Sequence, residues 1–584
     1  MGKQDTLDWW REARFGMFIH FGLYSAMEGI WKGEEVPGLG EWAQCRARIP
    51  VEEYKKNAEK VTLEEFDAEK YVQLAKDAGM KYIVFTAKHH DGFAMYDSKY
   101  SDYNIVKMGP SGRDPAKELA EAAKKAGLTM CFYYSQALDW EDPDATGNDW
   151  DYDPEKKDFR RFLDGKCKHQ LKEILTNYGD LGLVWFDVPR GISREQSIEV
   201  RDYVKSIQPN CLVSGRISYH TDIGDYGSLG DNEIPAGKLE GDWETPATLN
   251  HTWGYKGSDH HWKKPEELIR LMTELLSKGV NYLLNIGPMA SGKIPEESVY
   301  LLKEVGKWVH LNEEAIYGTK QTPFSVDFDW GKASQKGNTI YLYLFHRKTD
   351  LEISGIRNHI KKAILIGEEN QEVGVEEQHN DVLDEHIVKL TIPESKNPYM
   401  DVIKLELDGA IDVKDGLYQQ AEGRIDLPAY AAKLEGGKKI RKEEEAESAE
   451  REAEKNGTIR SDEIQLDKNG MISQWFDTEG KAQWKFMVYK PGTYRVSIAT
   501  RSTKYTEWVG GHTVCITCNG QTMKKTLEAD RPLPFADRFF FDDQISDVGT
   551  VTFDQPGEVV LELTMEQYNQ KDAAGLCVNK VILE

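Results

Sequence analysis

The sequence predicts a β/α barrel of the (β/α)8 type that is followed by two all-β sandwich domains. Three observations lead to this expectation. Up to residue 317, short apolar runs alternate with segments whose apolar residues recur every three to four positions. After residue 317 the apolar period changes to two, and no long helical segment intervenes. A chain of 584 residues is also too long for one hydrophobic core and should divide into several domains.

The first part of the chain, residues 1–318, carries the pattern of the barrel. Its apolar runs lie at 15–22, 82–93, 128–135, 181–188, 211–218 and 279–288. Strands that are apolar on both faces, and that crossover helices connect, form a parallel sheet covered by helices. No Gly-rich phosphate loop follows the first strand, which favours a closed barrel over an open doubly wound sheet. Several helices are expected to end in a left-handed glycine cap, at Gly79, Gly127 and Gly279.

The rest of the chain divides into two β domains and a connecting segment. Short strands and turns alternate over residues 319–408 and predict a β-sandwich. Residues 409–460 are expected to be a charged linker, because Lys and Glu dominate their second half. Strand patterns return over 461–584 and predict a second, independent sandwich that resembles carbohydrate-binding modules. Its candidate sugar platforms are Trp475, Trp484, Tyr494, Trp508 and Phe541.

Charge and composition narrow the classes of partner. The chain has 74 basic and 99 acidic residues, a net charge of −25, so its surface repels phosphate backbones and anionic lipid. Nucleic acid is therefore not expected as a partner, and no apolar run is long enough to span a membrane. The chain starts without a signal peptide. Two locations fit this start: the periplasm or the exterior, with a leader absent from this chain, and the cytoplasm.

Polar or aromatic side chains stand at the end of nearly every predicted barrel strand. In chain order they are His20, His89, His90, Asp91, Tyr134, Trp185, Asp187 and Arg216. The carboxyl ends of barrel strands meet at one face of the barrel, where active sites form. A single histidine or aspartate at a strand end is usually a cap or a packed residue. The collective pattern indicates a functional site.

These residue types suit hydrolysis of a glycosidic bond. The reaction needs one carboxylate as nucleophile or base and one protonated carboxyl as acid, while histidines and arginine hold sugar hydroxyls. Zinc is the alternative, because histidine and aspartate also ligate metals. However, adjacent residues of a strand point to opposite faces, so His89 and His90 would share one ion only at an irregular strand end. Neither a metal nor another cofactor is therefore expected.

Several sequence blocks resemble, in order, the α-L-fucosidases of glycoside hydrolase family 29. Through residues 9–318 these blocks are WWREARFGMFIHFGLYS, FTAKHHDGFAMYDS, FYYSQALDW, WFDV, WETPATLNHTWGYK, SKGVNYLLNIGPMASGKIP and VGKWVHLNEEAIYGT. The resemblance implies a retaining exo-glycosidase that releases terminal α-L-fucose from a glycan through a covalent glycosyl-enzyme. It is also compatible with a homo-oligomer.

The resemblance implies a role for each matching residue. Asp187 matches the nucleophile, although Val188 stands where the family usually has glycine. Glu244 is the first candidate for the acid/base, and Asp231 and Glu233 are the alternatives. Contacts to the sugar are implied for His20, Glu41, Trp42, His89, His90, Tyr134, Trp185 and Arg216.

Two other functions stay open. The same mechanism would serve another sugar, such as a β-galactoside, and a catalytically inactive barrel would serve as a sugar-binding protein. The presence of Asp187 and of all three histidines favours an enzyme over a sugar-binding protein.

Overall fold

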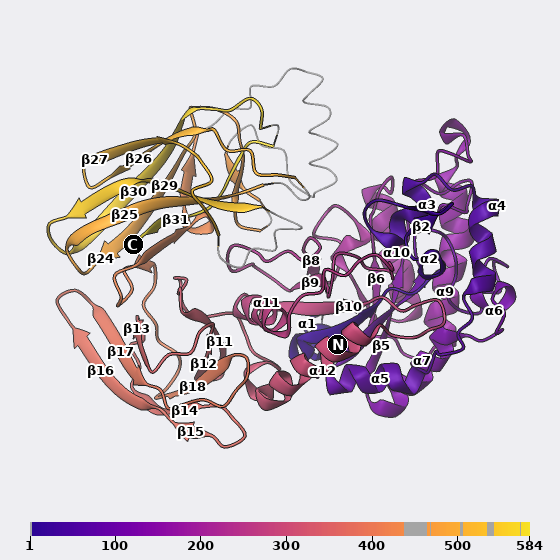
Figure 1. The fold of residues 1–584 in the computed structure, drawn as a ribbon, viewed down its shortest axis with the longest axis horizontal. Coiled ribbons are helices and arrows are strands. Elements are labelled where there is room, and N and C mark those ends of the chain that lie inside the picture. Colours follow the sequence, from indigo (N-terminus) through magenta and orange to yellow (C-terminus); the bar gives the residue numbers. More distant parts are fainter. Residues whose placement is uncertain (1–2, 437–463, 468, 503–505, 534–541, 573) are drawn as a thin grey trace.

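The computed structural model describes residues 3–436, 464–467, 469–502, 506–533, 542–572 and 574–584. Figure 1 shows a barrel with its helices on one side of the molecule and two β domains on the other. The expected order, a barrel followed by β domains, is therefore confirmed. The candidate platform Phe541 lies outside the described residues.

Eight parallel strands form the barrel sheet. They are β1 (Phe15–Ile19), β4 (Tyr82–Lys88), β5 (Thr129–Tyr134), β6 (Leu183–Phe186), β7 (Leu212–Val213), β8 (Gly227–Ser228), β9 (Trp243–Thr248) and β10 (Val280–Ile286). Strands that follow one another in this series are paired in the sheet, except β7 and β8, and β1 also pairs with β10. A single parallel bridge between Ser214 and Tyr226 joins β7 to β8 and closes the ring. Most of these strands are buried on both faces, which explains their uninterrupted apolar runs.

Six long helices cover the outside of the barrel. They are α5 (Ala68–Asp77), α7 (Pro115–Ala126), α9 (Lys168–Asn177), α10 (Arg194–Ile207), α11 (Pro265–Ser277) and α12 (Glu296–Leu311). Gly79, Gly127 and Gly279 have φ angles of +83°, +75° and +73°, which confirms the expected left-handed caps. Only a short 3-10 turn, Gly215–Ile217, lies between β7 and β8, and no helix joins β8 to β9, where every residue is described. One side of the barrel therefore has no helical cover.

A further helix, α1 (Lys3–Ala13), precedes β1 and contributes to the barrel interior. Its Trp10 is fully buried and stacks on Tyr226 at 4.4 Å between ring centroids. Both rings belong to a cluster that fills the barrel and includes Tyr82 and Trp185. The barrel is therefore a packed core and not a pore.

The first β domain is a sandwich of two antiparallel sheets. One sheet holds β11 (Gly331–Lys336), β12 (Thr339–Leu344), β18 (Asp401–Leu407), β14 (Ile360–Leu365) and β15 (Gln371–Glu372). The other holds β13 (Asp350–Ser354), β17 (Glu385–Thr391) and β16 (Gly374–Asn380).

The last domain also has two sheets. The first sheet holds β19 (Leu417–Tyr418), β24 (Lys481–Val488), β30 (Gly557–Gln567), β26 (Thr513–Cys518), β27 (Gln521–Thr526) and β21 (Lys433–Glu435). The second holds β22 (Gln465–Leu466), β23 (Ile472–Trp475), β31 (Leu576–Leu583), β25 (Gly492–Arg501), β29 (Asp543–Phe553), β28 (Arg531–Pro532) and β20 (Ile425–Pro428).

The structure differs from the sequence expectation between the two β domains. The strands β19, β20 and β21 lie in the expected linker, yet they pair with β24 and β31 of the last domain. The remainder of that linker, 437–463, lies outside the described residues. Buried side chains of the two β domains form one continuous cluster, so the last domain shares its core with the first.

The proposed sugar platforms of the last domain are mainly packed inside it. Trp475 and Trp484 are each 1% exposed, and Nε1 of Trp484 donates to the backbone oxygen of Pro428. Tyr494 and Trp508 are partly buried against the same core. Two of the four described platform residues therefore serve packing, as buried aromatic side chains usually do.

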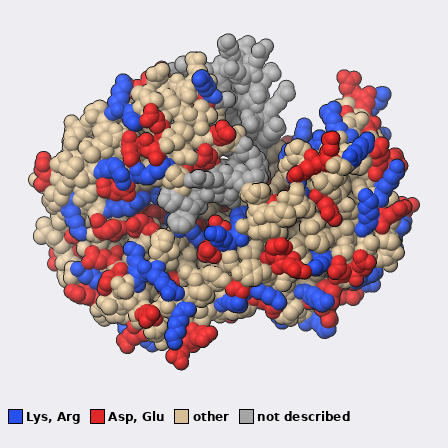
Figure 2. Space-filling view, in the orientation of Figure 1, with Lys and Arg blue, Asp and Glu red and all other residues tan. Residues whose placement is uncertain are grey.

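Acidic and basic side chains are interspersed over the surface. Figure 2 shows both signs side by side on the barrel and on the β domains, without a continuous basic patch on the face in view. None of the helices in the described ranges is long and apolar enough to cross a bilayer.

The close packing of α12 on α5 gives a test of the fold. A Cβ atom added at Gly306 of α12 would lie 1.9 Å from the backbone oxygen of Asp77, the last residue of α5. We expect Gly306→Ala to destabilise the barrel by about 1–3 kcal/mol, because a backbone atom cannot turn away as a side chain can. Lys303→Ala, on the exposed face of α12, is the control. Equal thermal unfolding midpoints for the two variants would show that the helices are not packed this closely.

Candidate active site

A pocket of about 270 Å³ lies at the carboxyl ends of the barrel strands. Pockets for drug-sized ligands occupy about 300–1,000 Å³, so this one suits a single small polar ring. Among the residues that the sequence singled out, those that line it are His20, Glu41, Trp42, His89, Trp185, Asp187, Arg216 and Asp231. Residues far apart in the sequence therefore meet here, as expected for the ends of parallel strands.

Asp187 directly follows β6 and is held by two donors. The hydroxyl of Tyr133 donates to its Oδ2 at 3.0 Å, and Nη1 of Arg216 donates to its Oδ1 at 3.2 Å. Burial raises the pKa of Asp187, while Arg216 opposes this shift. Two fixed donors leave the carboxylate oriented and only 9% exposed, an arrangement that suits a positioned nucleophile.

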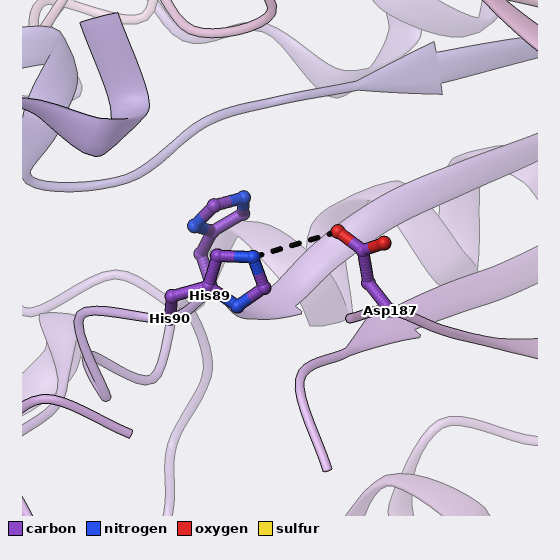
Figure 3. Close-up of side chains that lie close together, drawn as sticks. All are labelled: His89, His90 and Asp187. Carbon is purple, nitrogen blue, oxygen red and sulfur yellow. Dashed lines mark ion pairs between the residues drawn. The ribbon is translucent and has the colours of Figure 1, made fainter. Parts of the chain in front are cut away.

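The two adjacent histidines lie together because β4 ends at Lys88, one residue before them. Their ring centroids are 4.3 Å apart, and Nε2 of His90 lies 3.5 Å from Oδ2 of Asp187 (Figure 3). The irregular strand end that a shared ion would require is thus present, and the ligand atoms of His89, His90 and Asp187 all lie within 4.8 Å of one another. The Arg216 guanidinium on Asp187 disfavours a second cation there.

Hydrogen bonds fix the tautomers of two histidines. Nδ2 of Asn285 donates to the backbone oxygen of Trp253, so its Oδ1 accepts from Nδ1 of His20 at 2.7 Å. Ser135 Oγ donates to the backbone oxygen of Leu138 and therefore accepts from Nδ1 of His90 at 2.7 Å. In both rings Nε2 is then an acceptor.

Burial lowers the pKa of each of these histidines, to about 4 for His20 and about 3 for His90. It also lowers the pKa of His89 well below the usual value. All three rings are therefore neutral near pH 7. Neutral rings accept hydrogen bonds, which suits hydroxyl groups better than anions.

Tyr134, an expected sugar contact, lies on the other face of β5. Its hydroxyl donates to Oε1 of Gln170 on α9, and its ring packs in the core between the barrel and the helices. The neighbouring Tyr133 points inward instead: its ring stacks on His89 at 5.1 Å, and its hydroxyl binds Asp187. Because side chains alternate along a strand, a shift of one residue exchanges the two faces.

Glu41 is a buried acid in the wall of the pocket. Its Oε2 accepts from the backbone nitrogen of Gly254 at 3.0 Å, while Oε1 has no hydrogen-bond partner among the described residues. Burial raises the pKa of Glu41 to about 7. The ring of Trp42 packs edge-on against His90 at 5.1 Å and forms an apolar wall beside these polar groups.

Arg216 joins two of the acidic residues of the pocket, Asp187 and Asp231. Besides its bond to Asp187, its Nη2 donates to Oδ1 of Asp231 at 2.6 Å. Its guanidinium lies over the ring of Trp185 at 4.9 Å. Burial alone would lower the pKa of Arg216, but Asp231 and Asp187 outweigh it and hold the guanidinium charged.

Glu244, the first candidate for the acid/base, lies inside the barrel and not in the pocket wall. It is the second residue of β9 and is fully buried. Both oxygens are already bound: Trp185 Nε1 donates to Oε1 at 2.7 Å and the Tyr82 hydroxyl to Oε2 at 2.8 Å. Its contacts make it a support beneath Trp185.

Glu233, an alternative acid/base, is turned toward the last domain. Its Oε1 accepts from Nδ2 of Asn469 and its Oε2 from the backbone nitrogen of Gly230. Of the three candidates only Asp231 lines the pocket.

Val188 lines the pocket directly after Asp187 and has a φ angle of +40°. A β-branched residue rarely adopts this left-handed region, where glycine is unstrained. Val188, which stands where the family usually has glycine, therefore keeps the backbone conformation that glycine favours.

Sequence reasoning assigned no role to Tyr133, Ser135 and Leu39, which lie at or near this site. Tyr133 and Ser135 would have been found by extending the alternation of β5 from a single known inward residue. Asn285 is the sixth residue of β10, yet its bond to His20 leaves no local signal in the sequence.

Comparisons with known proteins agree in one family. The family model described as Alpha-L-fucosidase matches residues 1–314. The α-L-fucosidase of Dictyostelium discoideum is 28% identical over 398 residues, which are 62% of this chain and 83% of that protein. The crystal structure of an α-L-fucosidase from Vibrio sp. strain EJY3 is similar at a TM-score of 0.84 and 28% identity, and the match covers 99% of this chain and 98% of that one.

A third similar protein is a family 29 α-L-fucosidase from Bacteroides thetaiotaomicron, whose structure is described as a trapped covalent intermediate with 2-fluoro-fucosyl fluoride. It has a TM-score of 0.62 and 27% identity, with 69% of this chain and 96% of that chain covered.

The buried carboxyl of Glu244 predicts a pH-dependent stability difference. Burial raises its pKa from 4.5 to about 7, so the neutral acid stabilises the fold fully below pH 4.5 and loses this effect as the pH rises through 7. Glu244→Gln cannot ionise. Relative to the wild type, we expect this variant to gain up to about 3 kcal/mol in unfolding free energy between pH 4.5 and 8.

Urea unfolding of the wild type and Glu244→Gln at pH 5 and pH 8 measures this difference. Other titrating groups contribute equally to the unfolding free energy of both proteins, so their contributions cancel in the difference. A difference that stays constant with pH would mean that Glu244 is already ionised in the folded protein at pH 5.

Proposed function

Because the chain belongs to the α-L-fucosidase family of glycoside hydrolases, we propose that it is a retaining exo-acting α-L-fucosidase with Asp187 as nucleophile and Asp231 as acid/base. The observation that carries the proposal is the oriented carboxylate of Asp187 inside a small pocket of neutral histidines and aromatic rings. The trapped covalent intermediate of the Bacteroides relative supports a retaining route.

In this mechanism the two carboxyl groups act in two displacements. Asp187 attacks the anomeric carbon while Asp231 gives its proton to the departing glycosidic oxygen, so that an alcohol leaves and a glycosyl ester forms. Asp231 then removes a proton from water, whose oxygen attacks the same carbon. The ester bond to Asp187 breaks, free sugar is released, and both carboxyl groups regain their starting state.

Asp231 suits the acid/base role because proton transfer requires contact with the leaving oxygen before it requires a suitable pKa. Asp231 lines the pocket, and it contacts the same guanidinium, that of Arg216, as Asp187 does, so the two carboxyl groups are neighbours. Glu244 is enclosed by Trp185 and Tyr82, and Glu233 is bound to the last domain. Neither is placed to reach a sugar in the pocket.

The polar groups of the pocket suit the hydroxyls of one terminal sugar. Nε2 of His20 accepts there, and so does Oε1 of Glu41, which has no hydrogen-bond partner among the described residues. Trp42 and Trp185 offer flat apolar surfaces to the C–H groups of the ring. Arg216 compensates the charge of Asp187 before the covalent bond forms.

Kinetics on aryl glycosides test the reaction and the assignment together. We expect the wild type to hydrolyse aryl α-L-fucoside and not aryl β-D-galactoside. Asp187→Ala should lower kcat by roughly 10³-fold or more, because the covalent step is lost. Hydrolysis of the galactoside alone would assign another sugar, and binding of fucose without hydrolysis of either would indicate a sugar-binding protein.

Azide distinguishes the two carboxyl roles. With Asp187→Ala, azide should replace the nucleophile and give fucosyl azide of inverted configuration. With Asp231→Ala, azide should attack the glycosyl-enzyme and give the retained product, and activated leaving groups should suffer least. Glu244→Gln is the comparison: a retained azide product from this variant and none from Asp231→Ala would move the acid/base role to Glu244.

Two adjacent tyrosines provide a matched pair. We expect Tyr133→Phe to lower kcat by about 10-fold or more, because the hydroxyl that binds Asp187 is lost. Tyr134→Phe removes a bond to Gln170 on the other face of β5 and should keep kcat near the wild-type value. The proposed orientation of Asp187 is contradicted if the two variants lose activity equally while keeping the same thermal unfolding midpoint.

A further inference from the structure

We propose that the last domain is part of the catalytic unit, and that Asn469 is a positioning residue for Asp231. This inference rests on the proposed function, in which Asp231 is the acid/base. The region concerned is the loop of residues 229–242 between β8 and β9, on the side of the barrel that has no helix. Figure 1 shows β8 and β9 on the side of the barrel that faces the last domain.

Asp231 lies inside a tight turn that the side chain of Glu233 closes. The backbone nitrogen of Glu233 donates to the oxygen of Gly230 at 3.1 Å, and the nitrogen of Gly230 donates to Oε2 of Glu233 at 2.6 Å. The other carboxylate oxygen, Oε1, accepts from Nδ2 of Asn469 at 2.5 Å. One carboxylate thus shapes the turn that presents Asp231 and binds that turn to the last domain.

Two further contacts fix the same loop to the last domain. The backbone oxygen of Asn469 accepts from the nitrogen of Ala236 at 2.7 Å. The ring of Tyr430 packs so closely on Gly237 that an added Cβ would lie 2.0 Å from it. Asn469 is itself held, because its backbone nitrogen donates to Oδ1 of Asp467 at 2.8 Å. The loop therefore rests against residues of the last domain that are themselves hydrogen-bonded.

The contact is buried and charged, which makes it sensitive to loss. Glu233 is 6% exposed and Asn469 is 7% exposed. The charge of Glu233 also acts on Arg501 of the last domain, which forms two hydrogen bonds with Asp543. A buried carboxylate that loses its donor carries the full cost of desolvation, so the turn would rearrange.

Rearrangement of this turn would affect proton donation more than nucleophilic attack. Asp187 is held by Tyr133 and Arg216 from the barrel itself, independently of Asn469. An acid that is displaced by a fraction of an ångström loses much of its effect. Substrates whose leaving group needs a proton should therefore suffer, while a leaving group that departs as an anion should not.

The test changes the charge pattern of the pair and measures leaving-group dependence in the full-length enzyme. Asn469→Asp sets two carboxylates against each other. We expect kcat/KM for phenyl α-L-fucoside to fall about 10-fold or more, and for 2,4-dinitrophenyl α-L-fucoside by less than about 3-fold. Glu233→Gln combined with Asn469→Asp restores an amide–carboxylate pair and should return most of the lost rate.

A matched control exists in the same domain. Nε2 of Gln483 on β24 donates to Oε2 of Glu562 on β30 at 2.6 Å, so both partners belong to the last domain. Gln483→Glu makes the same chemical change as Asn469→Asp and should leave the ratio of the two rates unchanged. If Asn469→Asp does not fold, Asn469→Ala should likewise lower kcat/KM more for the phenyl substrate than for the dinitrophenyl substrate.

The outcomes separate the two proposals. If the wild type cleaves fucosides and Asp231→Ala depends on the leaving group, but the Asn469 variants do not, the positioning role is overturned and the proposed function stands. If Asp231→Ala shows no such dependence, the acid/base assignment fails first. An equal loss on both substrates in Asn469→Asp would indicate a structural role only and would also overturn the inference.

Discussion

The guanidinium of Arg216 is the charge on which the rest of the site depends. It lies between Asp187 and Asp231, two acids that would repel each other in a buried pocket without it. The barrel holds it at the junction of β7 and β8, where Nε donates to Ser228 and Nη2 to the backbone of Leu229. That junction is also where a single bridge closes the ring, so closure of the barrel and compensation of charge occur at one place.

The sequence predicts the barrel well because its signals are local. An apolar strand and a capped helix each show their pattern within a dozen residues, as at Gly127 after α7. The strands β19 to β21 show no such pattern, since each has two to four residues and pairs with strands far away in the sequence. The absence of helices around β8 could not be predicted either. The last domain contacts this side of the barrel, and that long-range contact leaves no local pattern in the sequence.

In the site, the sequence predicted which residues lie near the pocket more reliably than it predicted which way their side chains point. His20, Glu41, His89 and Asp187, which the resemblance singled out, line the pocket. Tyr134 was misplaced by one residue, because a strand with aromatic residues on both faces gives no indication of which face is inward. Glu244 resembles a strand-end acid, but it stands near the start of β9 and enters the barrel from the other end.

The contact between Glu233 and Asn469 spans 236 residues of sequence, and Asn469 lies between β22 and β23, whose sheet also includes β31 further along the chain. All eight barrel strands are therefore synthesised before Asn469, the residue of the last domain that binds Glu233. During synthesis the barrel strands can pair first, and the turn that presents Asp231 gains its contact with the last domain only when Asn469 has been made. Under the proposed roles of Asp187 and Asp231, the nucleophile is therefore positioned before the proton donor.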